Sequence, residues 1–158
     1  MEEQIEQVEI IEYLPELQPY MKALNVEWLE KYFEVEPIDE KVLSNPQEYI
    51  IDKGGKIYFA KLNGKIVGTV SLIKENEDSF ELSKMAVTER IQSKGIGKKL
   101  MLHSLAEAKK LGAKEVFLLS NTGLEKAINL YKKMGFVEES FDSSHYKRAD
   151  IFMRLKFL

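Results

Sequence analysis

The sequence contains no cysteine and only two histidines, His103 and His145, among its 158 residues. The lack of cysteine excludes disulfide bonds, thiolate zinc sites and a cysteine nucleophile. With so few histidines a histidine-rich metal site is not expected, and we predict no bound metal. A chain without cysteine fits a cytoplasmic protein, which is the location we expect.

Long apolar runs and basic stripes are also missing. No uninterrupted apolar stretch approaches the roughly 20 residues that a membrane-spanning helix needs. The acidic start Met1-Glu2-Glu3-Gln4 lacks the basic and apolar regions of a signal peptide. The formal net charge is -3 and the sequence pI is about 5.6. We therefore expect neither a membrane partner nor a nucleic-acid partner.

The composition that remains is that of a folded globular protein. Hydrophobic residues make up 44% and charged residues 31% of the chain, which is an ordinary balance for such a protein. This length suits one domain with one core. No repeat, low-complexity segment or linker divides the sequence, so we predict a single domain over residues 1–158.

The first 55 residues are predicted to be mainly helical. After a first strand over residues 8–13, Pro15 can begin a helix, because its missing N–H costs nothing in the first turn. Apolar residues at three- and four-residue spacing extend this helix to about Phe33. Two further prolines then leave short helical pieces around Lys41 and Tyr49.

Gly54-Gly55 marks a change from helical to strand character. Strands over residues 56–62, 65–74 and 80–87 are predicted to form an antiparallel meander, with Asn63-Gly64 as its first hairpin turn. Alternation along the third strand predicts two faces. One face carries Phe80, Leu82, Lys84 and Ala86, and the other carries Glu81, Ser83, Met85 and Val87.

The last third of the chain alternates between helix and strand. We expect a helix over residues 95–111, a strand over 115–120, a helix over 124–134, and final strands over 137–141 and 149–158. A strand–helix–strand unit after a meander favours a mixed α/β sheet with helices on both faces.

A polar loop with two glycines joins the strand over 80–87 to the next helix. Gly95 and Gly97 remove side chains where a ligand can approach the backbone, and the helix start offers unpaired N–H groups and a positive dipole. This arrangement suits a pyrophosphate, with Gln92 as a further donor and Lys98 as a nearby cation. The same glycines also fit a plain strand-to-helix turn, so these residues alone leave both interpretations open.

The segment Gln92-Ser93-Lys94-Gly95-Ile96-Gly97 is similar to the Gln/Arg-x-x-Gly-x-Gly/Ala signature of the GNAT superfamily of acyl-CoA N-acyltransferases. The preceding residues 81–87 resemble the family strand that leads into this signature. Residues 127–136, which end in Lys132-Lys133-Met134-Gly135-Phe136, resemble its second signature. The resemblance covers Lys56 to the C-terminus. It implies a cofactor-binding core over residues 56–158 and a variable acceptor-side part over residues 1–55.

The resemblance implies a GNAT-like fold and acetyl-CoA as co-substrate. In such enzymes two parallel strands, here residues 80–87 and 115–120, splay apart and open a cleft for the pantetheine arm of coenzyme A. A backbone N–H in this cleft would stabilise the oxyanion that develops on the thioester. The cofactor-binding residues that the resemblance implies are Met85, Ala86, Val87, Gln92, Ser93, Lys94, Gly95, Ile96, Gly97, Lys98 and Asn121.

The resemblance also implies two catalytic side chains. Tyr131 stands where the family places a general-acid tyrosine, and its phenol would protonate the departing sulfur. A plain core tyrosine is the alternative. Glu81, early on the cofactor strand, is the candidate base that removes a proton from the attacking amine. A solvent-facing glutamate is its alternative, with Glu48 and Glu125 as substitute bases.

Asn121 is a looser match to the family. Many relatives have an asparagine seven residues before the tyrosine, where this chain has Leu124, so Asn121 is the replacement candidate for contacting pantetheine. A turn-forming asparagine is the alternative. His145 and Arg148 precede the last strand, where their side chains could contact an acceptor. We expect them instead to lie on a loop and at a strand edge, without a catalytic role.

An aromatic group near the end of the first helix has two interpretations as well. Trp28, Tyr32 and Phe33 are able to line an acceptor pocket, but we expect them to pack in the core. No motif in the sequence indicates the acceptor.

The predicted function is transfer of an acetyl group from acetyl-CoA to a primary amine of a small molecule, an amino acid or a protein, by direct attack in a ternary complex. The alternative is a non-catalytic acyl-CoA-binding sensor or scaffold module. A purely structural interaction domain is a third hypothesis. Analogy with the family also makes a homodimer an expectation.

Overall fold

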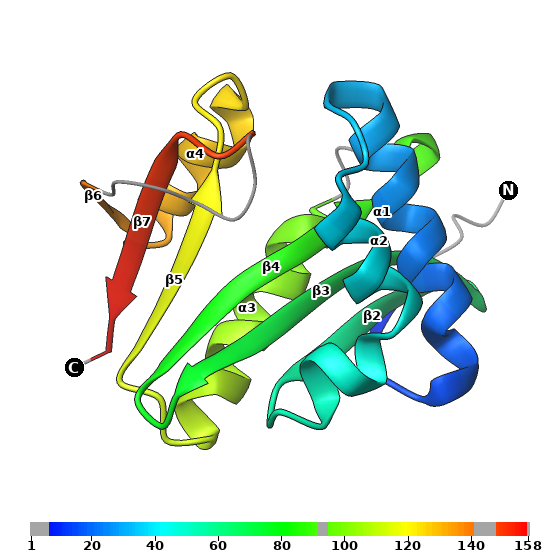
Figure 1. The fold of residues 1–158 in the computed structure, drawn as a ribbon, viewed down its shortest axis with the longest axis horizontal. Helices are drawn as coiled ribbons and strands as arrows, with labels where there is room; N and C mark the ends of the chain where they lie inside the picture. The colour runs from blue at the N-terminus through cyan, green and yellow to red at the C-terminus, as the bar shows by residue number, and fades with distance from the viewer. Residues whose placement is uncertain (1–6, 92–94, 141–147, 158) are drawn as a thin grey trace, which may run out of the picture.

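The computed structural model describes residues 7–91, 95–140 and 148–157. In these residues one seven-stranded sheet has the strand order β1-β2-β3-β4-β5-β7-β6 (Figure 1). The strands are β1 Val8–Glu12, β2 Lys56–Leu62, β3 Lys65–Asn76, β4 Ser79–Val87, β5 Glu115–Ser120, β6 Val137–Glu139 and β7 Ile151–Lys156. Neighbouring strands pair antiparallel except β4 and β5, which are parallel. The predicted mixed sheet with its antiparallel meander is confirmed.

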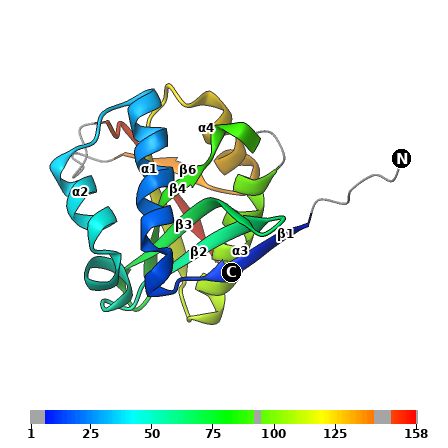
Figure 2. The same ribbon diagram turned by 90° about the vertical axis from the view of Figure 1, so that its right-hand side faces the viewer.

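Helices cover both faces of this sheet. The longer ones are α1 Gln18–Tyr32, α2 Pro37–Ser44, α3 Ile96–Lys110 and α4 Glu125–Lys133, and the short turns are η1 Pro15–Leu17, η2 Gln47–Ile51 and η3 Glu89–Ile91. Figures 1 and 2 show α1 and α2 on one face and α3 and α4 on the other. None of the helices in the described ranges is both long and apolar enough to span a membrane.

Two apolar clusters lie on the two sides of the sheet. Along β2, Tyr58 and Ala60 pack toward α3, whereas Ile57 and Phe59 pack toward α1 and α2. Successive side chains of a strand point to opposite faces, so a strand covered by helices on both sides buries nearly every residue. The strand meander therefore lies between two helical layers.

The predicted Asn63-Gly64 turn and the predicted helix over residues 95–111 are both present. Asn63 and Gly64 both have positive φ angles, of 50° and 83°, which the tight hairpin between β2 and β3 requires. The buried residues of α3 recur at three- and four-residue spacing, as a helix with one buried face requires. The helix ends at Lys110, one residue before the predicted end, and Leu111 is 43% exposed.

The strands β4 and β5 separate along their length. Their pairing runs only from Ser79 opposite Glu115 to Glu81 opposite Phe117. Beyond this point β4 continues to Val87 and β5 to Ser120 without further pairing between them. The predicted splayed parallel pair is thus confirmed, and it places a gap in the hydrogen bonding at the middle of the sheet.

A β-bulge interrupts β4 next to this gap. Ser83 pairs with Ser71 and Ala86 with Thr69, so Lys84 and Met85 together stand opposite a single residue of β3. Lys84 adopts a left-handed backbone with φ of 53°, which is strained for a residue with a side chain.

The bulge makes the predicted faces of β4 wrong beyond Ser83. The extra residue shifts the alternation by one position. Lys84 therefore reaches Asp39 on the α2 side of the sheet, instead of sharing a face with Phe80 and Leu82. Met85 and Val87 pack against the cluster on the α3 side, instead of sharing a face with Glu81.

Candidate functional site

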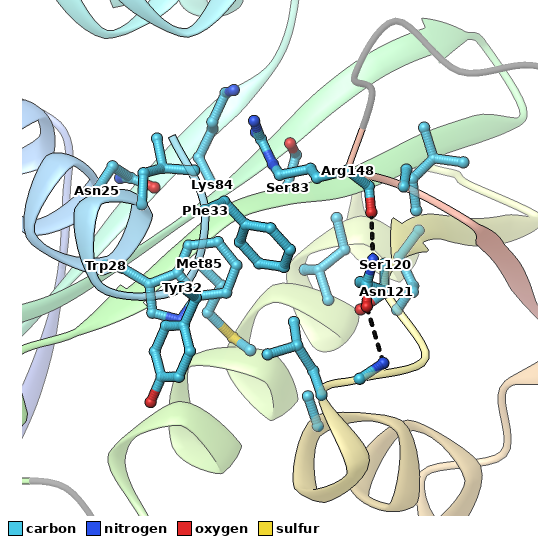
Figure 3. A pocket seen from close by; sticks show the side chains of 18 of the residues that line it. Asn25, Trp28, Tyr32, Phe33, Ser83, Lys84, Met85, Ser120, Asn121 and Arg148 are labelled. Carbon is cyan, nitrogen blue, oxygen red and sulfur yellow. Dashed lines mark hydrogen bonds between the residues drawn. The ribbon is translucent and has the colours of Figure 1, made fainter. Parts of the chain in front are cut away.

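A cavity of about 560 Å³ lies where β4 and β5 separate. Its wall comes from α1, from Asp39 of α2, from the middle of β4, from the end of β5 with the following turn and α4, and from residues 148–149 (Figure 3). A volume of this size is typical of sites that bind small molecules or cofactors. The splay of the sheet is therefore what creates the candidate site.

Glu81 lines this cavity at the last paired position of β4. Burial raises the pKa of its carboxyl group to about 7, and the negative charge of Glu75 adds to the rise. The positive charge of Lys84 and a hydrogen bond with Ser83 oppose it. A carboxyl group that titrates near neutral pH can accept a proton from a bound molecule under physiological conditions.

The raised pKa of Glu81 predicts that Glu81→Gln stabilises the fold above neutral pH. A raised pKa means that the folded state holds the proton more tightly than the unfolded state does. This stabilisation is complete below the ordinary pKa of 4.5 and is lost as the pH rises through about 7. The uncharged glutamine removes the cost of burying an ionised carboxylate, so we expect a gain of about 1–3 kcal/mol near pH 8 and almost none near pH 4. Urea unfolding at both pH values measures the difference in unfolding free energy between Glu81→Gln and wild type. An equal difference at both pH values would contradict a buried carboxylate at position 81.

Tyr131 lines the same cavity from α4. Burial raises the pKa of its phenol to about 12, so the hydroxyl group keeps its proton throughout the physiological range. Its ring lies 6.1 Å from that of Phe136, in the second signature segment. The structure thus brings a phenol and a carboxyl group, those of Tyr131 and Glu81, to one cavity from separate elements.

Four charged side chains form a cluster on the α2 side, and three of them, Asp39, Lys84 and Arg148, line the cavity. The Nζ of Lys84 lies 3.0 Å from Oδ1 of Asp39. The guanidinium of Arg148 binds both carboxylate oxygens of Asp39, at 2.8 and 2.9 Å, and Oε2 of Glu36, at 2.9 Å. Asp39 is fully buried, and the side chains of Glu36 and Arg148 are 11% and 16% exposed. A bidentate Arg–carboxylate pair with this burial is a firmly placed part of the wall.

The charges of this cluster hold one another in the ionised form. Burial disfavours the charged form of Asp39, but the hydrogen bonds from Arg148 and the charge of Lys84 outweigh it and lower the pKa of that carboxyl. Burial lowers the pKa of Lys84, and Asp39 partly offsets this effect. Removing one member would therefore leave an uncompensated buried charge.

One expectation for residues around the cavity is wrong, and another holds only in part. Arg148 does not lie at a strand edge, because its guanidinium is largely buried between α2 and β4. Trp28 packs against the apolar cluster on the α1 and α2 side, as expected, but it also lines the cavity with Tyr32 and Phe33, and Tyr32 is 43% exposed. Figure 3 shows these rings on the side of the cavity opposite Ser120 and Asn121.

Sequence reasoning missed Lys84 and Asp39. The signal for Lys84 was a lysine that the expected alternation places on the apolar face of its strand, beside Leu82 and Ala86. The signal for Asp39 was its position three residues after Glu36, where it closes a capping pair by accepting from the Glu36 N–H at 2.8 Å.

The predicted phosphate loop is described in part. Gln92, Ser93 and Lys94 lie outside the described residues. Gly95 precedes α3 with φ of 73°, and its carbonyl accepts from the N–H of Lys99 at 3.0 Å. Ile96 is buried in the core, so only its backbone faces the loop, whereas Lys98 is exposed. The first N–H groups of any α-helix lack partners within the helix, so the start of α3 is suited to an anion site.

The remaining predicted residues lie near the splay. Met85 lines the cavity, and Ala86 and Val87 pair with β3. Asn121 also lines the cavity; its amide nitrogen donates to the carbonyl of Arg148 at 2.6 Å, and its oxygen accepts from the N–H of Gly123 at 2.8 Å. These bonds show Asn121 shaping the turn, and its contact with pantetheine stays a prediction.

The substitute bases differ in their positions. Glu125 is exposed but lines the cavity, whereas Glu48 is exposed on η2 and does not line it. His145 lies outside the described residues. Within the described parts of the chain, no three histidine, aspartate or glutamate side chains are grouped so as to hold a metal ion.

Comparison with known proteins identifies the family. Residues 20–136 match the acetyltransferase (GNAT) family. The chain therefore belongs to this family, which is a family of acyl-CoA-dependent N-acyltransferases, as the resemblance in the sequence implied.

Individual relatives agree with this assignment. The chain is 32% identical over 120 residues to the uncharacterized N-acetyltransferase YvbK of Bacillus subtilis (strain 168), a match that covers 72% of this chain and 77% of that protein. Its fold is similar to that of a GNAT acetyltransferase from Staphylococcus aureus Mu50, with a TM-score of 0.85, 23% identity, and 95% and 99% of the two chains covered. PaiA N-acetyltransferase from Thermoplasma acidophilum, solved in complex with coenzyme A, is similar with a TM-score of 0.74 and 19% identity over 96% of this chain and 99% of that one.

Proposed function

We propose that this protein transfers an acetyl group from acetyl-CoA to a primary amine by direct attack within a ternary complex. The observation that carries the proposal is that Glu81 and Tyr131 line one cavity at the point where β4 and β5 separate. Their pKa values, raised to about 7 and about 12, suit a base and an acid respectively.

The proposed reaction removes two protons from the acceptor nitrogen and adds one proton to the departing sulfur. An ammonium ion cannot attack, so Glu81 accepts a proton from the acceptor, directly or through a water molecule. The amine nitrogen then forms a bond to the acetyl carbon, and the carbon–sulfur bond of the thioester breaks. Tyr131 donates its proton to the departing sulfur, and the second proton that the nitrogen loses as the amide forms returns to the Tyr131 oxygen through water. A backbone N–H among residues 85–87 stabilises the oxyanion between these two steps.

Acetyl-CoA is proposed to lie with its pantetheine arm between β4 and β5 and its pyrophosphate at the start of α3. Gly95 and Gly97 place no side chain there, and a Cβ added to Gly95 would meet no atom of the described residues within 4 Å. The proposed contacts include Gln92, Ser93 and Lys94 in the loop, together with Lys98 and Asn121. The coenzyme A complex of the Thermoplasma acidophilum relative supports the choice of cofactor.

Substitutions at Gly97 test the pyrophosphate position. A Cβ at Gly97 would lie 4.0 Å from Cγ2 of Val87, which is an ordinary contact. Gly97→Ala should therefore keep acetyl-CoA affinity within about threefold and stabilise α3 by up to about 1 kcal/mol. Gly97→Leu carries a bulky side chain to the helix start and should weaken acetyl-CoA binding about tenfold or more. Calorimetric titration of both variants compares them; unchanged affinity in the leucine variant would place the pyrophosphate elsewhere.

The proposed acceptor is a primary amine of a small molecule, an amino acid or a peptide. The α1 side of the cavity has an aromatic surface, formed by Trp28, Tyr32 and Phe33. The α2 side is polar, but its charged side chains, Asp39, Lys84 and Arg148, are paired with one another. Together with Glu36, the cluster carries two positive and two negative charges, which cancel, so it offers no excess negative charge to a polycation. This supports an acceptor with a single amine. A cytoplasmic homodimer is part of the same proposal.

Identification of the acetylated product tests direct attack. The protein is incubated with acetyl-CoA, with and without a panel of primary amines. Mass spectrometry then gives the masses of the amines and of the intact protein. We expect the acetyl group on an amine and an unmodified chain when amine is absent. A chain that carries a transferable acetyl group before the amine is added would replace direct attack with an acyl-enzyme route.

A further inference from the structure

Arg148 joins two parts of the molecule that lie on opposite sides of the cavity. Its guanidinium is held by Asp39 and Glu36 at the start of α2, at 2.8–2.9 Å. Its own carbonyl accepts from the Asn121 side chain, after β5, at 2.6 Å. We call this chain of contacts, Asp39–Arg148–Asn121, the Arg148 bridge.

The β5 end of the Arg148 bridge is fixed by further bonds. The Asp150 carboxylate accepts from the N–H and the hydroxyl of Thr122, at 2.8 and 2.9 Å. The Asp150 N–H donates to the carbonyl of Ser120 at 2.9 Å. Because both neighbours of Ala149 are bonded in this way, the backbone that presents the Arg148 side chain is held against the end of β5.

The α2 end of the bridge is fixed by the shape of the pairing. A guanidinium that binds both oxygens of one carboxylate is restricted in orientation as well as in distance. Lys84, on the bulge of β4, binds the same Asp39 at 3.0 Å. The bridge therefore ties α2, β4 and the end of β5 together across the side of the sheet where β4 and β5 are no longer paired.

All three members of the bridge line the cavity, together with Trp28 and Phe33 of the α1 side. Figure 3 shows Arg148 reaching across the cavity from the Asn121 side toward Lys84. We infer that Arg148 is a positioning residue that closes the acceptor end of this cavity and so limits the acceptor to a compact amine. The restriction on the acceptor rests on the proposed function, whereas the closure of the cavity does not.

Closure is tested without substrate by the single tryptophan of the chain, Trp28. Its fluorescence reports how readily a small neutral quencher, acrylamide, enters the cavity. Arg148→Met keeps an apolar stem and removes the ion pairs, and Arg148→Lys keeps the charge but loses the paired contacts. We expect the quenching constant of Trp28 to rise roughly twofold in Arg148→Met and by a smaller amount in Arg148→Lys.

Arg154 provides the matched control. It also lies between two carboxylates, Glu115 at 2.6 Å and Glu139 at 3.3 Å, but it does not line the cavity. Arg154→Met should lose stability and leave Trp28 quenching unchanged. If Arg148→Met does not fold, Arg148→Lys carries the comparison. Quenching equal to wild type in folded Arg148 variants, or an equal rise in Arg154→Met, would overturn the inference.

Selectivity among acceptors is the second measurement. In a series of straight-chain primary monoamines of increasing length, the ratio of kcat/KM for long over short amines should rise about tenfold in Arg148→Met. The KM for acetyl-CoA should change less than about twofold, which separates this role from general damage to the site. An unchanged ratio would remove Arg148 from selectivity. Absence of turnover with every amine would count against the proposed function, while Trp28 quenching would still decide closure.

Discussion

Tyr131→Phe is expected to lower kcat by about 10²-fold or more at saturating substrates, with little change in acetyl-CoA affinity. The substitution removes only the hydroxyl group that would protonate the departing sulfur and keeps the ring that packs near Phe136. A loss of this size corresponds to about 2.7 kcal/mol of transition-state stabilisation. Initial rates of coenzyme A release give kcat, and calorimetry gives the affinity.

Tyr58→Phe is the matched control for this result. Tyr58 is 2% exposed, its hydroxyl has no hydrogen-bond partner among the described residues, and it does not line the cavity. Removing that hydroxyl should leave kcat unchanged and stabilise the fold slightly, since a buried unpaired polar group is costly. Wild-type kcat in Tyr131→Phe would exclude Tyr131 from the chemistry. An equal loss in both variants would indicate a general effect on the fold.

Glu81→Gln is expected to lower kcat/KM by about 10²–10³-fold above neutral pH. Glutamine fills nearly the same space and cannot accept the proton of the amine. The same substitution is expected to stabilise the protein at that pH, because Glu81 is a buried carboxylate with a pKa raised to about 7. Loss of activity with a gain in stability is the mark of a functional group held in an unfavourable environment.

The pH profile tests whether Glu81 acts as the base. Only the ionised carboxylate accepts a proton, so wild-type kcat/KM should fall as the pH decreases through about 7. In Glu81→Gln this step should disappear, although titration of the amine itself remains. Glu125→Gln is the matched control, because Glu125 also lines the cavity but is exposed. If the step persists in Glu81→Gln and vanishes in Glu125→Gln, Glu125 is the base.

Much of the fold could be predicted because its signals are local. The Asn63-Gly64 turn, the apolar stripe of α3 and the glycine at position 95 each depend on residues close together in the sequence. The predicted splay of β4 and β5 came from the resemblance to a family. In the structure it appears as pairing that stops at Glu81 and Phe117.

The charged part of the cavity could not be predicted in the same way. Asp39, Lys84 and Arg148 come from a helix, a strand bulge and a loop that are far apart in the sequence. Strand alternation assigned Lys84 to the wrong face, because a bulge shifts the phase without changing the apolar pattern. In the sequence, Arg148 looks like an ordinary basic residue of a surface loop. Its pairing with α2 is visible only in the folded structure.

Acceptor-dependent release of coenzyme A tests the central proposal most directly. Wild-type protein is mixed with acetyl-CoA, and the free thiol is followed with a panel of primary amines present or omitted. The proposal predicts a slow background without amine and a large, saturable increase with at least one amine of the panel. Saturable binding of acetyl-CoA, with thiol release at the background rate for every amine, would contradict an acetyltransferase and favour a module that only binds acyl-CoA.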